Sequence, residues 1–244
     1  MDTKLLSIGK TASILGVSID TLRRWDNAGR LLSVRVSPRG HRYFRYSDVE
    51  LFLQDEVTLV KRWAESPNAN VPDARGYCQT RDVFQGRLES LQSNLSRQFP
   101  IAITSLITAV CGEIGNNSFD HNLGNWPDVM GVYFAYSLQS RKVVVADRGQ
   151  GIWTTLRRVR PKLKNSSEAL KMAFTEAVSG RQPEARGNGL KFVREVIISN
   201  PLALKFQTGN AFLSLKQGDK DVLITHAKNS IQGCFALIDF EKYI

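Results

Sequence analysis

Residues 109–122, with the sequence AVCGEIGNNSFDHN, decide the fold, because they join the pattern of a buried helix to polar residues at regular intervals. Apolar residues recur at helical spacing from Leu106 to Ile114, which predicts a helix over about 101–122 with one buried face. Three polar side chains at intervals of four form one stripe on this helix: Glu113, Asn117 and His121. Burying such groups without partners is costly, so the stripe is either a binding site or a solvated helix face.

Two later segments each place two glycines one residue apart. Residues 143–152, VVVADRGQGI, join a β-branched run to an acid and two glycines, which predicts a strand followed by a turn. Residues 186–192, RGNGLKF, place two glycines before a new apolar periodic segment, which predicts the start of a helix. Glycine lets the backbone approach a ligand closely, and the free N–H groups at a helix start can hold phosphate.

The order of these three segments resembles the GHKL ATPase superfamily, which includes gyrase, histidine kinases and anti-sigma kinases. Three motifs carry the resemblance: Glu113-x-x-x-Asn117-x-x-x-His121, Asp147-x-Gly149-x-Gly151 and Gly187-x-Gly189-Leu190. It implies an α+β fold in which a two-layer α/β sandwich binds ATP and Mg²⁺. A phosphoacceptor helix of the His-Glu-x-x-Arg kind does not precede the motifs, so a conventional sensor histidine kinase is disfavoured.

Under this resemblance the motif residues have implied roles. Asp147 accepts a hydrogen bond from the exocyclic amine of adenine, and Gly149 and Gly151 let the backbone approach the base and ribose. Asn117 holds Mg²⁺ together with water and phosphate oxygens, since magnesium prefers hard oxygen ligands. Glu113 is the candidate general base toward a water or an incoming hydroxyl. The other candidates for nucleotide contacts, mainly to phosphate, are His121, Arg186, Gly187, Gly189 and Leu190.

The sequence departs from the family in two places. Lys191 stands where some members carry another glycine, and it either adds a phosphate contact or lies in solvent. Residues 152–185 take the place of the family's lid, and within them 157–164, RRVRPKLK, are unusually basic. This run either closes over the triphosphate, contacts DNA or forms a solvated face.

The remaining pattern of the predicted sandwich alternates between helices and strands. An amphipathic helix is predicted over 76–98, and a second helix is capped by Asn165 and Glu168. Antiparallel strands are predicted over 130–138 and 141–147, and further strands over 203–209, 211–217, 221–227 and 232–240. Strands beside segregated helices are typical of an α+β sandwich.

Composition limits the class of protein. The chain has 244 residues, of which 42% are hydrophobic, so it can bury a core in one large domain or two small ones. Its sequence contains no apolar run long enough to cross a membrane and no signal-peptide pattern at the N-terminus, which predicts a cytoplasmic protein. The three cysteines lack metal-ligand spacing and are expected to be reduced: Cys78, Cys111 and Cys234.

A formal net charge of +10 favours a polyanionic partner. Residues 23–45 hold seven arginines and one acid, and residues 141–191 hold twelve Lys or Arg against four acids. Two basic stretches so far apart favour separate sites rather than one.

The N-terminal residues predict a helix-turn-helix. Ser7 can cap a helix that ends at Gly16, and Ser18 can cap a second helix over about 19–27. The β-rich runs LLSVRV and RYFRY, separated by SPRGH, predict a hairpin or wing. Ser47-x-x-Glu50 is a capping box for a third helix.

Residues 4–56 resemble the winged DNA-binding domain of the MerR family. The matching segments are Ile8-Gly9-Lys10-Thr11-Ala12, Leu15-Gly16-Val17-Ser18, Thr21-Leu22-Arg23-Arg24-Trp25 and Gly40-His41-Arg42-Tyr43. The resemblance implies double-stranded DNA as partner, with the second helix in the major groove and the wing against the backbone or minor groove. The DNA-binding candidates are Thr21, Arg23 and Arg24 on that helix and Arg39, His41, Arg42 and Tyr43 in the wing.

The predicted organisation is a DNA-binding domain over 1–64, a linker over 65–75 and an ATP-binding domain over 76–244. MerR proteins generally dimerise through a long helix, but the apolar pattern stops near Trp63 and the polar, proline-containing ESPNANVPD follows. A homodimer would therefore use a short helix or the second domain.

Three functions are compatible with these motifs. The favoured one is a transcription regulator whose DNA binding or oligomerisation depends on ATP. The second is an anti-sigma-like serine/threonine kinase, or partner-switching module, that phosphorylates a small partner protein. The third is a degenerate nucleotide domain that acts as a scaffold, which the presence of Glu113, Asn117 and Asp147 disfavours.

Overall fold

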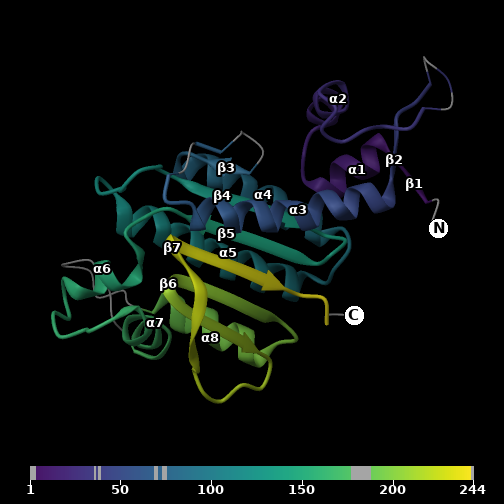
Figure 1. Cartoon of the computed structure of the whole chain (residues 1–244). Helices are drawn as coiled ribbons and strands as arrows, with labels where there is room; N and C mark the ends of the chain where they lie inside the picture. Colours follow the sequence, from purple (N-terminus) through teal and green to yellow (C-terminus); the bar gives the residue numbers. More distant parts are fainter. Residues whose placement is uncertain are drawn as a thin grey trace.

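The computed structural model describes residues 4–35, 37, 40–68, 71, 72, 76–176 and 188–242. A small N-terminal module of helices and short strands lies at one end of a larger antiparallel sheet that has helices packed on its faces (Figure 1). The mixed α+β class predicted from the sequence is confirmed.

The N-terminal module contains the predicted helix-turn-helix. Helix α1 (Ile8–Leu15) is capped by the Ser7 side chain and ends at Gly16, whose φ of 66° suits glycine. Helix α2 (Ile19–Asn27) is capped by Ser18, which accepts a hydrogen bond from the Thr21 N–H. Leu22 and Trp25 of α2 face the module core and are buried, as their spacing predicts.

The strand pairing in this module differs from the predicted hairpin. Strand β2 (Tyr43–Arg45) pairs with the N-terminal strand β1 (Leu5–Ser7), and in the described part of the wing one bridge joins Val34 to Tyr43. Leu6 and Phe44 are opposite each other in this pair and both are buried, so the β1–β2 pairing fills the core.

Helix α3 (Tyr46–Glu65) begins one residue before the predicted capping box, and among the described side chains none caps its first turn. The capping-box prediction is therefore wrong, because the Ser47 hydroxyl bonds to the adjacent Asp48 instead. The backbone N–H of Tyr46, one of the four N–H groups at this helix start that lack a partner within the helix, donates to the carbonyl of Lys4, just before β1.

The two halves of α3 lie in different cores. Near its start, Val49 packs in the N-terminal module, and Phe52 lies against the Trp25 ring with centroids 5.1 Å apart. Near its end, Val60 and Ala64 are buried against residues of the large sheet. The division at residues 64 and 75 stays a prediction, but α3 itself contributes to both cores.

The sheet has strand order β3-β4-β5-β7-β6, with every neighbouring pair antiparallel. Its strands are β3 (Tyr77–Cys78), β4 (Val132–Ser137), β5 (Lys142–Asp147), β6 (Ala203–Lys216) and β7 (Ile224–Asp239). The predicted β4–β5 pair is confirmed. The four strands predicted at 203–240 are instead two long ones, because β6 continues past Gly209 through shifts in register.

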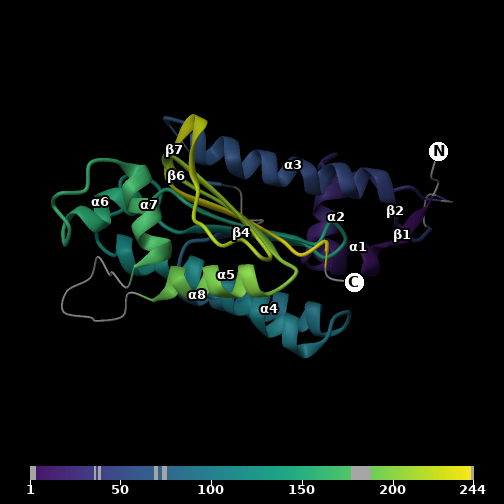
Figure 2. The same cartoon turned by 90° about the horizontal axis from the view of Figure 1, so that it is seen from below.

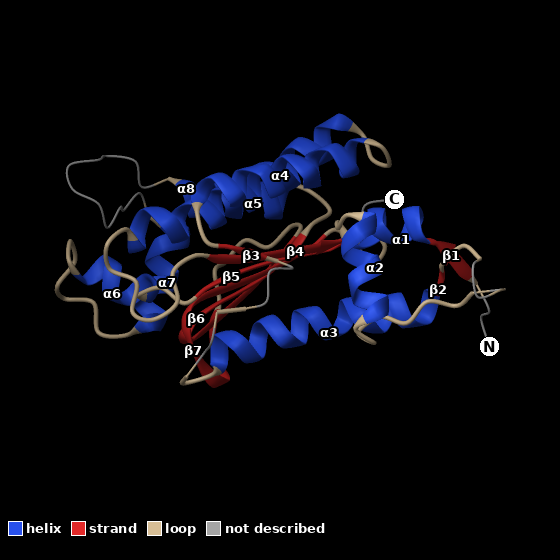
Figure 3. Cartoon of the chain, turned by 90° about the horizontal axis from the view of Figure 1, so that it is seen from above, coloured by secondary structure: helices blue, strands red, loops and turns tan. Residues whose placement is uncertain are grey.

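Helices cover both faces of this sheet. Besides α3, the helices around the sheet are α4 (Arg81–Ser96), α5 (Ile101–Asn122), α6 (Gly151–Arg157), α7 (Ser166–Thr175) and α8 (Gly189–Ser199). Figures 2 and 3 show α4, α5 and α8 on one face and α3 on the other, so the two-layer description omits a layer. The helix predicted from residue 76 begins only at Arg81, because Tyr77 and Cys78 pair with β4 and Thr80 caps α4.

Candidate functional site

The most deeply placed polar residue of the motifs is Asp147 at the end of β5, whose exposed fraction is 2%. One carboxylate oxygen accepts a hydrogen bond from the Ser118 hydroxyl of α5 at 2.8 Å. The other accepts from the Gly149 N–H at 2.7 Å. The carboxylate therefore joins the central helix to the first glycine turn.

Burial raises the pKa of Asp147 to about 6, although hydrogen bonds from Ser118, Gly149 and the Cys234 backbone oppose the rise. All three of these donors are uncharged, so no formal positive charge among them offsets the desolvation of the carboxylate. Such a group can accept one more hydrogen bond from an N–H donor.

Asn122 fixes the first glycine turn against α5. Its side-chain oxygen accepts from the Gln150 N–H at 2.7 Å, and its side-chain nitrogen donates to the Ser118 carbonyl at 2.7 Å. A Cβ on Gly149 would lie 2.0 Å from that nitrogen, so only glycine fits there. Gly151 begins α6 with a φ of 75°, which also favours glycine.

The sequence prediction missed Ser118 and Asn122. Each directly follows a residue of the predicted stripe in the sequence, Asn117 and His121 respectively, and both are buried. The signal that could have found them is their own spacing of four on a buried face, since two buried polar side chains there require partners. Their partners are Asp147 and the turn that follows it.

The polar stripe and the second glycine motif meet at the start of α8. A Cβ on Gly189 would lie 2.4 Å from a carboxylate oxygen of Glu113 and 3.3 Å from the side-chain nitrogen of Asn117. The structure therefore brings together the three motifs through Glu113, Asn117, Asp147 and the glycines next to them.

The other predicted nucleotide contacts are less closely placed. His121 is half-buried, with its carbonyl accepting from the Gln150 side chain. Leu190 packs against the main core. Arg186 and Gly187 lie outside the described residues. Within the described ranges, no three His, Cys, Asp or Glu side chains gather as a metal site.

Part of the basic run at 157–164 lies beside the first glycine turn. Arg158 donates a hydrogen bond to the Gln150 side chain, and Arg157 lies over the Trp153 ring. The adjoining α6 is at the end of the molecule opposite to α1 and α2 (Figure 1). The contacts of this run with phosphate or DNA stay predictions.

The second candidate surface is the outer face of α2. Arg23 and Arg24 are exposed there, and Thr21 is half-buried beside Ser18 at the start of the helix. Arg23 pairs with exposed Asp20 at 2.7 Å, an arrangement that costs little to exchange for a phosphate or base contact.

In the predicted wing, Asp26 of α2 organises the backbone and two arginines. Its carboxylate accepts from Arg42 at 2.6 Å, from Arg35 at 2.9 Å and from the Ser33 N–H at 2.8 Å. Burial alone would raise the pKa of Asp26, but these hydrogen bonds outweigh it and hold the pKa well below its ordinary value.

These contacts bear on the wing candidates. Arg42 holds the wing against α2 and also bonds Asn27, which the sequence prediction of a DNA contact did not include. His41 is exposed and Tyr43 is half-buried in β2. Arg39 lies outside the described residues. The DNA contacts of all these residues stay predictions.

Comparison with known proteins identifies the family of the N-terminal module, which carries the α2 surface. Residues 7–44 match the family described as "MerR family regulatory protein". These residues form a MerR-type helix-turn-helix domain. A domain of this type indicates a DNA-binding transcription regulator.

Other similarities are more limited. The chain is 37% identical over 59 residues to the type II methyltransferase M.Eco47II of Escherichia coli, which covers 24% of this chain and 14% of that protein. A chain of the SiaB–SiaC complex from Pseudomonas aeruginosa superposes with a TM-score of 0.33 and 16% identity, over 78% of this chain and 97% of that chain. No functional conclusion follows from either. None of the described helices is long and apolar enough to span a bilayer.

Proposed function

We propose that this chain is a transcription regulator that binds ATP between α5 and the two glycine motifs, and that its DNA affinity changes with its nucleotide state. The observation that carries the proposal is the buried carboxylate of Asp147, held by α5 and the first glycine turn in a chain with a MerR-type domain. The choice of ATP as the ligand comes from the resemblance of the sequence to the GHKL superfamily.

The residues fit the adenosine end of ATP. Asp147 has hydrogen-bonding capacity that its uncharged protein donors leave available, and the exocyclic amine of adenine is a neutral donor of the required kind. A Cβ on Gly149 would collide with the Asn122 side chain, so glycine lets the backbone of the turn lie close to α5, beside the carboxylate. Ser118 and Asn122 are assigned the role of orienting this half of the site.

The phosphate end is assigned to the start of α8 and to Glu113 and Asn117. Free N–H groups at a helix start favour phosphate, and Glu113 and Asn117 both approach Gly189 there. Mg²⁺ would be held by the Asn117 oxygen together with phosphate oxygens and water, since magnesium keeps several waters. The metal would neutralise phosphate charge.

Coupling between ATP and DNA requires that ATP bind two conformations of the chain with different affinity. A typical coupling of 1–3 kcal/mol corresponds to a change in DNA affinity of roughly 5- to 150-fold. The same factor must appear in the ATP affinity when DNA is added, because the linkage is reciprocal.

The test uses the full chain and its preferred DNA, selected from a random pool. We expect ATP with Mg²⁺ to bind with measurable heat in a calorimetric titration and to change the DNA dissociation constant at least fivefold. Absence of binding heat would refute the nucleotide site. Heat without any change in DNA affinity would refute the coupling.

A second candidate function, phosphoryl transfer to a partner protein, is supported by one observation. The Glu113 carboxylate lies beside the start of α8, where a base toward an incoming hydroxyl would be needed.

We expect Glu113→Gln to keep ATP binding within about threefold while lowering phosphate release, or transfer to a co-purified protein, by about 10²–10⁴-fold. Radiolabelled ATP measures both reactions. Equal turnover in the two proteins would exclude Glu113 as the base.

A further inference from the structure

Arg148 lies between Asp147 and Gly149 in sequence, but its side chain is on the opposite face of the sheet. Strand residues alternate between faces, so when Asp147 faces α5, Arg148 faces the layer formed by α3. Its side chain is 1% exposed, which is rare for arginine and requires a full set of partners.

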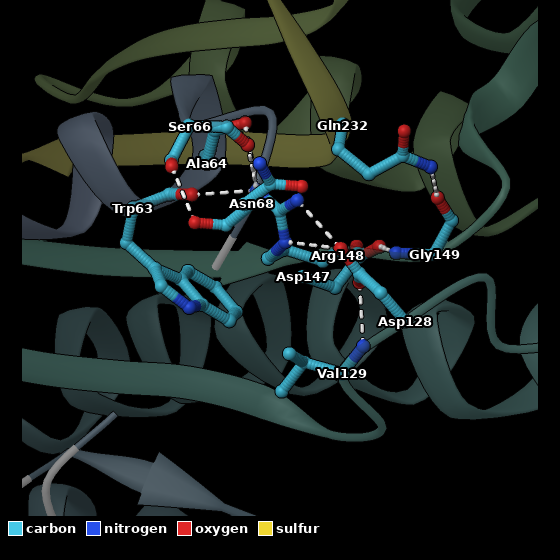
Figure 4. A network of polar contacts seen from close by, with 10 residues as sticks. All are labelled: Trp63, Ala64, Ser66, Asn68, Asp128, Val129, Asp147, Arg148, Gly149 and Gln232. Atoms are coloured by element: carbon cyan, nitrogen blue, oxygen red, sulfur yellow. Dashed lines mark hydrogen bonds and ion pairs between the residues drawn. The ribbon is translucent and has the colours of Figure 1, made fainter. Parts of the chain in front are cut away.

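The first partner of Arg148 is Asp128. The guanidinium donates to one carboxylate oxygen of Asp128 from Nε at 2.9 Å and from Nη2 at 2.6 Å (Figure 4). Burial alone would raise the pKa of Asp128, but the hydrogen bond and charge of Arg148 outweigh it and lower the pKa. The Asp128 carboxylate therefore stays charged and holds the guanidinium in place.

The other partners are backbone carbonyls at the end of α3. Nη1 donates to the carbonyls of Trp63 at 2.6 Å, Ala64 at 3.4 Å and Ser66 at 2.8 Å. The last carbonyls of a helix lack partners within the helix and carry partial negative charge, so a cation there is favoured. Arg148 thus caps the C-terminal end of α3.

Helix α3 connects this cap directly to the MerR-type domain. It has 20 residues without an internal glycine or proline, which corresponds to a rod of about 30 Å. Its first turns lie in the core that supports α2, through Val49 and the Phe52–Trp25 contact. A displacement of the capped end is therefore carried to the base of the DNA-reading helix.

We infer that Arg148 is the positioning residue through which nucleotide occupancy at Asp147 and Gly149 sets the position of α3 and the DNA-reading helix. The inference rests on the proposed function, since it assigns the route of the coupling. Arg148 is the residue between Asp147 and Gly149, so a movement of the glycine turn on binding would be transmitted to the guanidinium through its own backbone. The end of α3 then follows the guanidinium or loses its cap.

The test is Arg148→Lys in the full chain. Lysine keeps one positive charge near Asp128, but a single ammonium group cannot bond the carboxylate and three carbonyls together. We expect ATP affinity within about threefold of the unchanged protein, whereas the ratio of DNA dissociation constants with and without ATP falls from at least fivefold to below twofold.

The matched control is Arg81→Lys, which alters the ion pair of Arg81 with Asp120 between α4 and α5 on the other face of the sheet. It should preserve the ATP effect on DNA affinity. If Arg148→Lys also preserves it, the inference is overturned. If the unchanged protein itself lacks the effect, it is the proposed coupling that fails.

A measurement on the unchanged protein covers the case in which Arg148→Lys does not fold. Hydrogen exchange of the amides at 60–66 should change at least twofold when ATP and Mg²⁺ are added, because the cap on those turns shifts. An ATP effect on DNA affinity without any change in exchange at these amides would overturn the route through Arg148.

Discussion

Asp147→Asn is expected to stabilise the nucleotide-free protein and to weaken its binding of ATP at least tenfold. Burial raises the pKa of Asp147 from its ordinary 3.8 to about 6, so keeping the group ionised at pH 7 costs the folded state free energy. A neutral isostere removes that cost. At about 1.4 kcal/mol per pKa unit, we expect a gain in the free energy of unfolding of roughly 2–3 kcal/mol at pH 7.

The pH dependence of this gain has a definite sign. The folded state holds the proton of Asp147 more tightly than the unfolded state. Below pH 3.8 the group is protonated in both states, so it does not lower the free energy of unfolding. As pH rises from 3.8 to about 6, ionisation of Asp147 lowers the free energy of unfolding of the unchanged protein, and above pH 6 it falls no further from this cause. The difference between Asp147→Asn and the unchanged protein should therefore open between these values and stay constant above them.

Two of the three hydrogen bonds to Asp147, those from Ser118 and Gly149, can accommodate the amide. The Ser118 hydroxyl also lies 3.3 Å from the Ile114 carbonyl, so it can donate there and accept from the new NH₂ group. The amide oxygen can still accept from the Gly149 N–H. The same NH₂ group faces the adenine amine as donor against donor, so ATP affinity should fall by at least tenfold.

Urea unfolding at pH 4, 5, 6 and 7.5 and calorimetric titration with ATP measure the two effects. Asp221→Asn makes the same change of carboxylate to amide at an exposed position, and it is expected to alter neither the stability nor the ATP affinity. A variant that is less stable than the unchanged protein at pH 7.5 would contradict the cost assigned to Asp147. Normal ATP binding by the variant would remove Asp147 from the site.

Asp26→Asn is expected to destabilise the protein and to reduce discrimination between specific and nonspecific DNA. The amide loses the charge that holds Arg35 and Arg42, which should cost about 1–3 kcal/mol of unfolding free energy. Because hydrogen bonds lower the pKa of Asp26, its contribution is present above the ordinary value and is lost as pH falls below it. The stability difference should thus be constant from pH 5 to 8 and shrink at lower pH.

The DNA effect of Asp26→Asn follows from the loss of wing geometry. Removing one negative charge slightly favours nonspecific binding to phosphate, whereas a displaced wing weakens contacts to the selected sequence. We expect the ratio of specific to nonspecific affinity to fall about tenfold, as measured by fluorescence anisotropy at fixed salt. Asp20→Asn, whose pairing with Arg23 is exposed, is the control and should change stability by less than about 0.5 kcal/mol. An unchanged affinity ratio in Asp26→Asn would show that the wing geometry held by Asp26 does not contribute to the preference for the selected DNA sequence.

The local elements could largely be predicted from the sequence, because their signals are local. Ser7, Ser18 and Asn165 cap the helices that their positions predict, and α5 has the predicted bounds. The spacing of Glu113 and Asn117 correctly indicated one polar face. The approach of this face to Gly189, at the start of α8, is known only from the structure.

What the sequence did not predict depends on contacts between distant segments. The pairing of β1 with β2 is decided by Leu6 opposite Phe44, which are far apart in the chain. Arg148 counted in the sequence only as one basic residue of a charged stretch, because its role requires knowing that α3 covers the second face of the sheet. Ser118 was missed because the apolar periodicity gave no indication of its buried partner.

The position of α3 has a consequence for dissecting the chain into fragments. A truncation that begins after residue 65 would strip the second face of the sheet and leave Tyr133, Val144 and Phe235 to water, an apolar surface prone to aggregation. Chimaeras that graft another DNA-binding domain onto the part of the chain that forms the large sheet therefore need to retain the last two turns of this helix.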